Sequence, residues 1–73
     1  MNESEVRRAR FITEYGYKDC WPNSIVQKYF KLKSFCMGLA VVIRLTDSEK
    51  GTLDFMRYEG ERVYYDFKPI NSW

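Results

Sequence analysis

Apolar and polar residues alternate through the last third of the chain. Two alternating segments flank Glu59-Gly60-Glu61. A period of two is typical of strands with one buried face, and a short turn with glycine is typical of a hairpin. We therefore predict a β-hairpin over residues 52–68. Its predicted core face carries Leu53, Phe55, Val63, Tyr65 and Phe67.

Residues 38–46 allow two interpretations. A strand is predicted by the strict alternation of Leu39, Val41, Ile43 and Leu45. The β-branched residues in this run favour that interpretation. A third helix stays an alternative, because a helical stripe is formed by Phe35, Leu39, Val42 and Ile43. Residues 47–51 are predicted to form a turn in which Gly51 takes a positive φ.

The first half of the chain has helical periodicity instead. Residues 2–15 are predicted to form a helix that Asn2 or Ser4 caps and that Gly16 ends. A second helix is predicted to begin at Pro22, because one helical face collects Ile25, Val26, Tyr29 and Phe30.

This order of elements predicts a single small α+β domain over residues 1–73. Two N-terminal helices are expected to pack on a small antiparallel sheet of about three strands, which ends in a β-hairpin. A domain of this length buries a modest core, so its stability is expected to be a few kcal/mol.

Composition argues against catalysis. The chain has no histidine, the commonest general base and metal ligand, but it has two tryptophans, six tyrosines and five phenylalanines. It also lacks a glycine-rich phosphate loop and a metal-ligand spacing. Asp54 and Asp66 can form a carboxylate pair if their strands are neighbours, but exposed strand carboxylates rarely act in catalysis. We therefore expect a protein that is not an enzyme and binds no metal or cofactor.

The cysteines and the N-terminus bear on the compartment. Cys20 and Cys36 can form one disulfide, or both can be free thiols. The N-terminal residues 1–10 are polar and lack the apolar core of a signal peptide. A cytoplasmic protein with free thiols is therefore expected. No membrane partner is expected either, because the longest apolar run, 35–43, is about half the length that spans a bilayer.

A protein partner is the binding function that the hairpin favours. Its second face combines tyrosine, methionine, arginine and acidic residues, a composition typical of protein interfaces. The predicted partner-binding residues are Met56, Arg57, Tyr58, Tyr64 and Asp66. An exposed edge strand also offers a route to a homodimer.

Nucleic-acid binding by the N-terminal helices is the alternative. The formal net charge is +2, and residues 1–34 hold seven basic side chains against four acidic ones. Two helices joined by a short connector resemble the arrangement of a helix-turn-helix. The residues that would contact nucleic acid are Arg7, Arg8, Arg10, Gln27, Lys28 and Lys31.

These features predict a non-enzymatic binding module, with a protein as its favoured partner. Small domains without chemistry are often regulators or inhibitors that block a site on a larger assembly. Phages and mobile elements encode many of them, including anti-CRISPR and anti-restriction inhibitors. That analogy rests on size and type alone.

Overall fold

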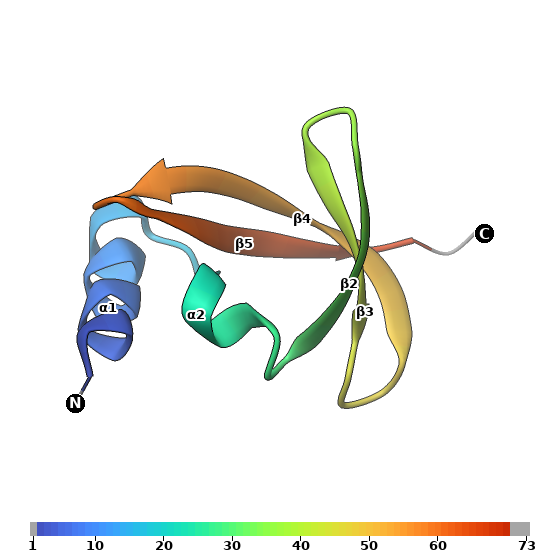
Figure 1. The fold of residues 1–73 in the computed structure, drawn as a ribbon, viewed down its shortest axis with the longest axis horizontal. Helices are drawn as coiled ribbons and strands as arrows, with labels where there is room; N and C mark the ends of the chain where they lie inside the picture. The colour runs from blue at the N-terminus through green and yellow to red at the C-terminus, as the bar shows by residue number, and fades with distance from the viewer. Residues whose placement is uncertain (1, 71–73) are drawn as a thin grey trace.

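The computed structural model describes residues 2–70, which form two helices and five strands (Figure 1). In chain order they are α1 (Glu3–Tyr15), β1 (Cys20–Pro22), α2 (Asn23–Val26), β2 (Phe30–Cys36), β3 (Leu39–Arg44), β4 (Glu49–Tyr58) and β5 (Glu61–Pro69). All strand pairs are antiparallel, in one sheet of order β1-β5-β4-β3-β2. β1 and β2 are therefore the edge strands. None of the helices in this part of the chain is long and apolar enough to cross a membrane.

The first helix forms where the sequence predicts it. The Asn2 side chain accepts a hydrogen bond from the backbone N–H of Glu5 at 2.9 Å, which satisfies one of the donors left unpaired at a helix start. Gly16 ends the helix in the left-handed region (φ 76°), and its N–H donates to the carbonyl of Ile12. Phe11 is the buried residue of α1.

The predicted second helix is wrong beyond its first turn. α2 has four residues and no side-chain cap, and the chain from Phe30 onward is strand β2. Phe30 and Leu32 point inward with strand periodicity, and β2 pairs with β3 from Phe30 to Cys36, with one register shift between Leu32 and Ser34. Pairing with β3 thus outweighs the helical stripe that the local sequence suggests. The predicted two helices on about three strands become one helix, a helical turn and five strands.

Strand β3 and the β4–β5 hairpin confirm the strands predicted near residues 38–46 and 52–68, but the hairpin faces are wrong. Tyr58 pairs with Glu61, so the turn has two residues, with φ 50° at Glu59 and 82° at Gly60. Phe55 therefore lies opposite Tyr64, whereas a three-residue turn would place it opposite Tyr65. A register change of one residue exchanges the faces of a strand.

A bulge in β5 lets β4 and β5 continue past this point. Tyr65 pairs with Asp54 and Lys68 pairs with Thr52, so two residues of β5 oppose one of β4. Asp66, with φ 58°, is the residue that makes this bulge. It returns Phe67 to the face that carries Phe55 and Tyr64.

Gly51 is a strand residue of β4 rather than the predicted turn glycine with a positive φ. The turn before it spans residues 45–48, where Ser48 takes φ 59°. A Cβ atom on Gly51 would lie 2.5 Å from the Phe67 ring and 2.6 Å from the Lys68 carbonyl oxygen. Glycine is therefore needed here for close packing between strands.

The sheet has a core on each face. On the inner face, Leu53 and Tyr64 pack with Phe30 and with Val26 of α2. On the outer face, a second cluster is formed by Phe11 of α1 with Cys20, Tyr58 and Val63. The β4–β5 hairpin is thus buried from both sides next to the helices, whereas β2 and β3 cross it and project beyond it (Figure 1).

Candidate interaction surface

The five predicted partner-binding residues do not form one surface. Tyr64 is 1% exposed in the inner core, and Met56 and Tyr58 lie under α1 on the outer face. Arg57 is exposed on the inner face, and Asp66 sits in the bulge with its carboxylate 3.3 Å from the Lys68 ammonium. The prediction assumed that these residues share one solvated hairpin face, but the inner core covers Tyr64 and α1 covers Met56 and Tyr58.

Tyr58 shows how closely α1 joins the hairpin. Its hydroxyl donates to the Glu14 carboxylate at 2.6 Å, and its ring meets Phe11 edge to face, with ring centroids 5.1 Å apart. The hydrogen bond to Glu14, together with burial, raises the pKa of Tyr58 to about 12. This tyrosine is a structural residue that binds the helix to the sheet.

The predicted phosphate-contacting arginines bind the protein's own acidic residues. Arg7 donates to Glu61 at 2.5 Å, and its Nε lies 3.7 Å from the Glu59 carboxylate. Arg8 pairs with Asp19 at 2.7 Å, and Arg10 pairs with Glu59 at 2.6 Å. These ion pairs fix α1 to the β4–β5 turn and to the segment before β1. They leave little unneutralised charge on the helix for nucleic acid.

Glu61 is the centre of this network. Burial raises the pKa of its carboxyl, but hydrogen bonds from the Ser24 backbone N–H and from Arg7 outweigh burial and hold the pKa below its ordinary value. The Ser24 N–H lies 2.8 Å from the carboxylate. One ionised side chain thus joins α1, α2 and β5.

The rest of the predicted nucleic-acid surface is dispersed. Gln27 follows α2 directly, Lys28 lies in the loop after it, and Lys31 is on β2. α2 is a single turn, so the helix-turn-helix-like arrangement is not formed. All three side chains are exposed. Of the α1 arginines, Arg8 reaches the loop after α2, where its guanidinium lies 5.2 Å from the Tyr29 ring centroid.

The groups considered for chemistry form no disulfide and no hydrogen-bonded carboxylate pair among residues 2–70. Cys20 and Cys36 are free thiols; Cys20 is fully buried, and burial raises its pKa to about 11. No hydrogen bond links Asp54 and Asp66, which lie opposite Tyr65 and in the β5 bulge respectively. Among residues 2–70 there is no group of three His, Cys, Asp or Glu side chains that can hold a metal ion.

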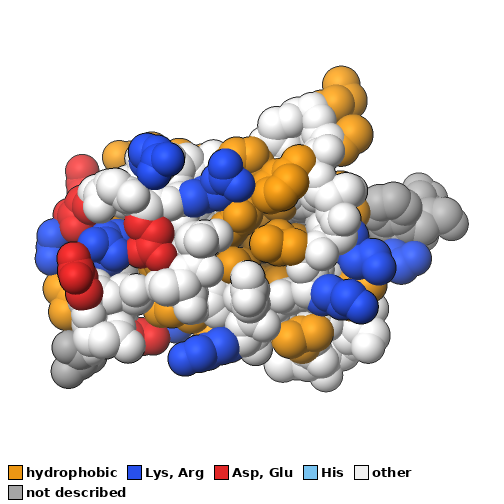
Figure 2. All heavy atoms as spheres, in the orientation of Figure 1, with side chains coloured by type: hydrophobic (Ala, Val, Ile, Leu, Met, Phe, Trp, Pro, Cys, Tyr) orange, Lys and Arg blue, Asp and Glu red, His pale blue; other side chains and the backbone are white. Residues whose placement is uncertain are grey.

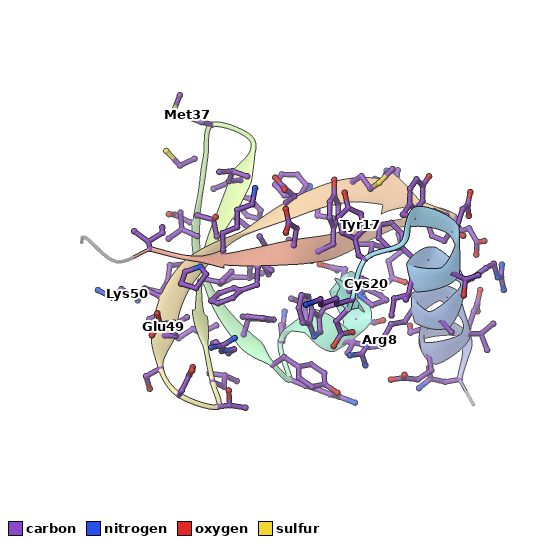
Figure 3. All side chains as sticks on the ribbon, turned by 180° about the vertical axis from the view of Figure 1, so that it is seen from behind. Arg8, Tyr17, Cys20, Met37, Glu49 and Lys50 are labelled. Atoms are coloured by element: carbon purple, nitrogen blue, oxygen red, sulfur yellow. The ribbon has the colours of Figure 1, made fainter. Side chains whose placement is uncertain are left out.

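The most exposed apolar side chains lie on a hairpin that the sequence did not single out. β2 and β3 are joined by a turn at Met37 and Gly38, with φ 53° and 79°. Met37 is 95% exposed at the tip, and Phe35, two residues before it on β2, is 52% exposed. Figure 3 shows Met37 at the far end of this arm, away from the rest of the molecule. The sequence feature that could have predicted this exposed surface is the apolar turn between the two strands, Phe35-Cys36-Met37-Gly38.

Phe35 belongs to an aromatic group at the base of the arm. Its ring meets that of Phe55 edge to face at 5.6 Å, and the Arg62 guanidinium lies 5.3 Å and 4.9 Å from the two ring centroids. We call Phe35, Phe55 and Arg62 the aromatic notch. Figure 2 shows apolar side chains gathered below the projecting hairpin, with basic side chains beside them.

Arg62 of the notch and its neighbour Arg57 have no acidic partners among the described residues. Arg57 lies directly opposite Arg62 in the β4–β5 ladder, and neither forms an ion pair with any residue of the described range. Like charges directly opposite each other destabilise a sheet. A pocket of about 300 Å³ between them is lined by Asn23, Arg57, Gly60, Glu61 and Arg62. Its one carboxylate, that of Glu61, is occupied by Arg7 and Ser24.

Comparison of the chain with protein-family models, with curated proteins and with solved structures found no match.

Proposed function

We propose that this protein is a non-enzymatic module that binds another protein through the tip of the β2–β3 hairpin and the aromatic notch. The observation that carries the proposal is the exposure of Met37 (95%) and Phe35 (52%) on an arm that projects from the sheet. Large apolar side chains gathered on a projecting surface mark interaction sites more often than scattered ones do.

The chemistry of the surface supports a protein partner. Aromatic residues, methionine and arginine are the residue types enriched at protein interfaces. Phe35 and Met37 supply apolar contact. The guanidiniums of Arg57 and Arg62, which have no acidic partner among the described residues, suit a carboxylate of the partner. Within this class we propose a regulator or inhibitor of a larger assembly, by the analogy of size and type with phage-encoded inhibitors.

The thiol of Cys36 allows a direct test in the native sequence. Cys36 is exposed, whereas Cys20 is buried with a raised pKa, so a photoactivatable maleimide will label the arm selectively. Labelled protein illuminated in a lysate of the source cells should give a discrete protein adduct. That adduct should survive nuclease treatment and disappear when excess unlabelled protein competes.

Matched variants identify the surface. Phe35→Ala and Met37→Ala should each weaken competition about tenfold or more, as expected for residues at an interface centre. Leu45→Ala is the control, because Leu45 is 51% exposed on a different turn and should compete like the unaltered chain. Equal competition by all three variants, or no adduct at all, would refute the proposal.

A further inference from the structure

The outer face of the sheet has a second region that no helix occupies. Cross-strand rows place Lys31, Ile43 and Lys50 together, and Ser34, Val41 and Thr52 in the next row. We call this region of β2, β3 and the start of β4 the open half. A pocket of about 150 Å³ lies on it, lined only by strand residues: Lys33, Ser34, Val41, Val42, Ile43 and Lys50. Val41 and Ile43 are partly exposed at its centre.

The open half is basic at its margin. Lys31 and Lys33 form no ion pair within residues 2–70, and Lys50 points outward at the end of the molecule away from α1 (Figure 3). No acidic residue lines the pocket. Lys68, in the row of Thr52, is already paired with Asp66. An aliphatic centre therefore has a lysine margin, which complements a partner that is both apolar and acidic.

The other end of the same face shows what such a surface accepts. We call the region that carries Met56, Tyr58, Val63 and Tyr65 the covered half. There α1 inserts Phe11 between the sheet residues, and its flanking arginines pair with Glu59 and Glu61 of the hairpin turn. An amphipathic basic helix thus lies on an acidic margin. The margin of the open half has the opposite charge, because lysines surround Val41 and Ile43.

We propose that the open half binds an acidic amphipathic helix of a partner protein, with an apolar side chain in the pocket and carboxylates toward Lys31 and Lys33. An apolar cavity of about 150 Å³ holds a six-carbon ring, so one leucine or phenylalanine side chain fits. Nucleic acid suits this surface less well. No aromatic residue lines the pocket to stack on bases, and a phosphate backbone has no apolar group to cover Val41 and Ile43.

This proposal is independent of the aromatic notch, because the two sites lie on opposite faces of the sheet. The probe is a fluorescein-labelled synthetic helix with leucines at positions i, i+3, i+4 and i+7 and glutamates on both sides. One control peptide has lysines in place of the glutamates, and another is a scrambled sequence of the same composition. Fluorescence anisotropy should show saturable binding of the acidic helix, at least tenfold tighter than that of either control.

Variants of the full chain locate the binding. The double variant Lys31→Glu/Lys33→Glu should weaken binding at least tenfold, whereas Lys18→Glu, on the connector before β1, should leave it unchanged. Phe35→Ala should also leave it unchanged, which separates this site from the notch. Circular dichroism checks that each variant is folded. The proposal is overturned by equal affinity for acidic and basic peptides, by insensitivity to the double variant, or by tighter binding of an oligonucleotide than of the acidic helix.

Discussion

The covered and open halves of the outer sheet face are built on the same strand, and only one of them is filled by the chain itself. β4 carries Met56 and Tyr58 in the covered half and Lys50 and Thr52 in the open half. The covered half is closed by α1, an aromatic cluster and ion pairs. The open half keeps a shallow apolar pocket among lysines. This difference is confined to the outer face, because Phe30 of β2 and Ala40 and Val42 of β3 are buried in the inner core.

The covered and open halves also differ in whether their basic side chains have acidic partners. In the covered half each arginine of α1 is matched by acidic groups of the hairpin turn or of the segment before β1. In the open half, Lys31 and Lys33 have no such match within the described chain. Lysines on an edge strand such as β2 also discourage pairing with a second copy of the strand. The predicted homodimer through an edge strand stays a prediction, and this edge does not favour it.

The two halves should differ most in the free energy of unfolding that is lost when one apolar residue in each is truncated to alanine. Phe11→Ala removes a fully buried ring and should destabilise the fold by about 3–5 kcal/mol. That is comparable to the whole stability expected of a domain of this size. Ile43→Ala, in the open half, should cost about 1 kcal/mol. Urea unfolding followed by tryptophan fluorescence measures both.

If Phe11→Ala does not fold, the milder Phe11→Leu keeps the comparison measurable, with an expected loss of about 1–3 kcal/mol. An Ile43→Ala loss as large as that of the Phe11 variant would mean that the open half is buried in solution, which contradicts the division.

The start of β4 should be sensitive to a single added methyl group. Gly51→Ala places a Cβ against the Phe67 ring and the Lys68 backbone, and the backbone cannot move aside as a flexible side chain can. We expect a loss of about 1–3 kcal/mol, typical of overpacking. Gly38→Ala is the control for space, because a Cβ there meets no atom within 4 Å and only the positive φ opposes it. A Gly51→Ala protein as stable as the parent would refute the close packing.

Removal of one charge from each half should give a smaller difference, measured as the shift of the urea midpoint. Arg7→Gln leaves the carboxylate of Glu61 without its guanidinium partner and should lower the urea midpoint. Lys31→Gln removes a lysine that has no acidic partner and should leave the midpoint unchanged or raise it slightly. The effect of Arg7→Gln should largely persist in 0.5 M NaCl, because the Arg7 and Glu61 side chains are mostly buried and salt screens such pairs much less than exposed ones. Equal losses in the two variants would contradict the assignment of charges.

The smallest expected effect is a loss of folding stability that is absent at neutral pH and appears only in alkaline solution. The folded pKa values of Cys20 (about 11) and Tyr58 (about 12) lie above their ordinary values of 9.0 and 10.0. The fold thus favours the protonated forms. This contribution is complete below about pH 9 and is lost as pH rises through 11 and 12. Unfolding midpoints measured from pH 7 to 12 should fall steeply above pH 10.

Tyr58→Phe isolates the tyrosine contribution to this alkaline loss. The variant lacks the group that titrates, so its midpoint should fall less steeply between pH 10 and 12 than that of the parent. Parallel curves for the two proteins would show that Tyr58 does not titrate against the fold.

The sequence predicted those parts of the fold that depend on local signals. The cap at Asn2, the stop at Gly16 and the presence of strands β3, β4 and β5 depend on local signals and were confirmed. The faces predicted from the alternation were not: in β3 the buried residues are Ala40 and Val42 rather than Leu39, Val41 and Ile43. The end of α2 was not predictable in this way. Phe30 and Leu32 fit a helical or an extended chain equally well until β3 pairs with them, and that pairing is a tertiary contact.

The candidate site was missed for a related reason. Tyr58 and Tyr64 were assigned to a solvated face because a hairpin considered alone has one, and the two-residue turn and the position of α1 together bury both. The exposed Phe35 and Met37 lie in a turn between strands, where an apolar pattern has no regular period. Whether an apolar residue packs or projects then depends on the strand register, which sequence alone leaves open.

The most direct test of the division between the halves is an NMR titration of ¹⁵N-labelled protein with the acidic amphipathic helix. We predict progressive shifts of the backbone amides around Lys31, Val41, Ile43 and Thr52. The amides of Phe11 and Val63 should stay in place. Shifts in the covered half together with loss of the α1 signals, or no shift anywhere at millimolar peptide, would contradict the account.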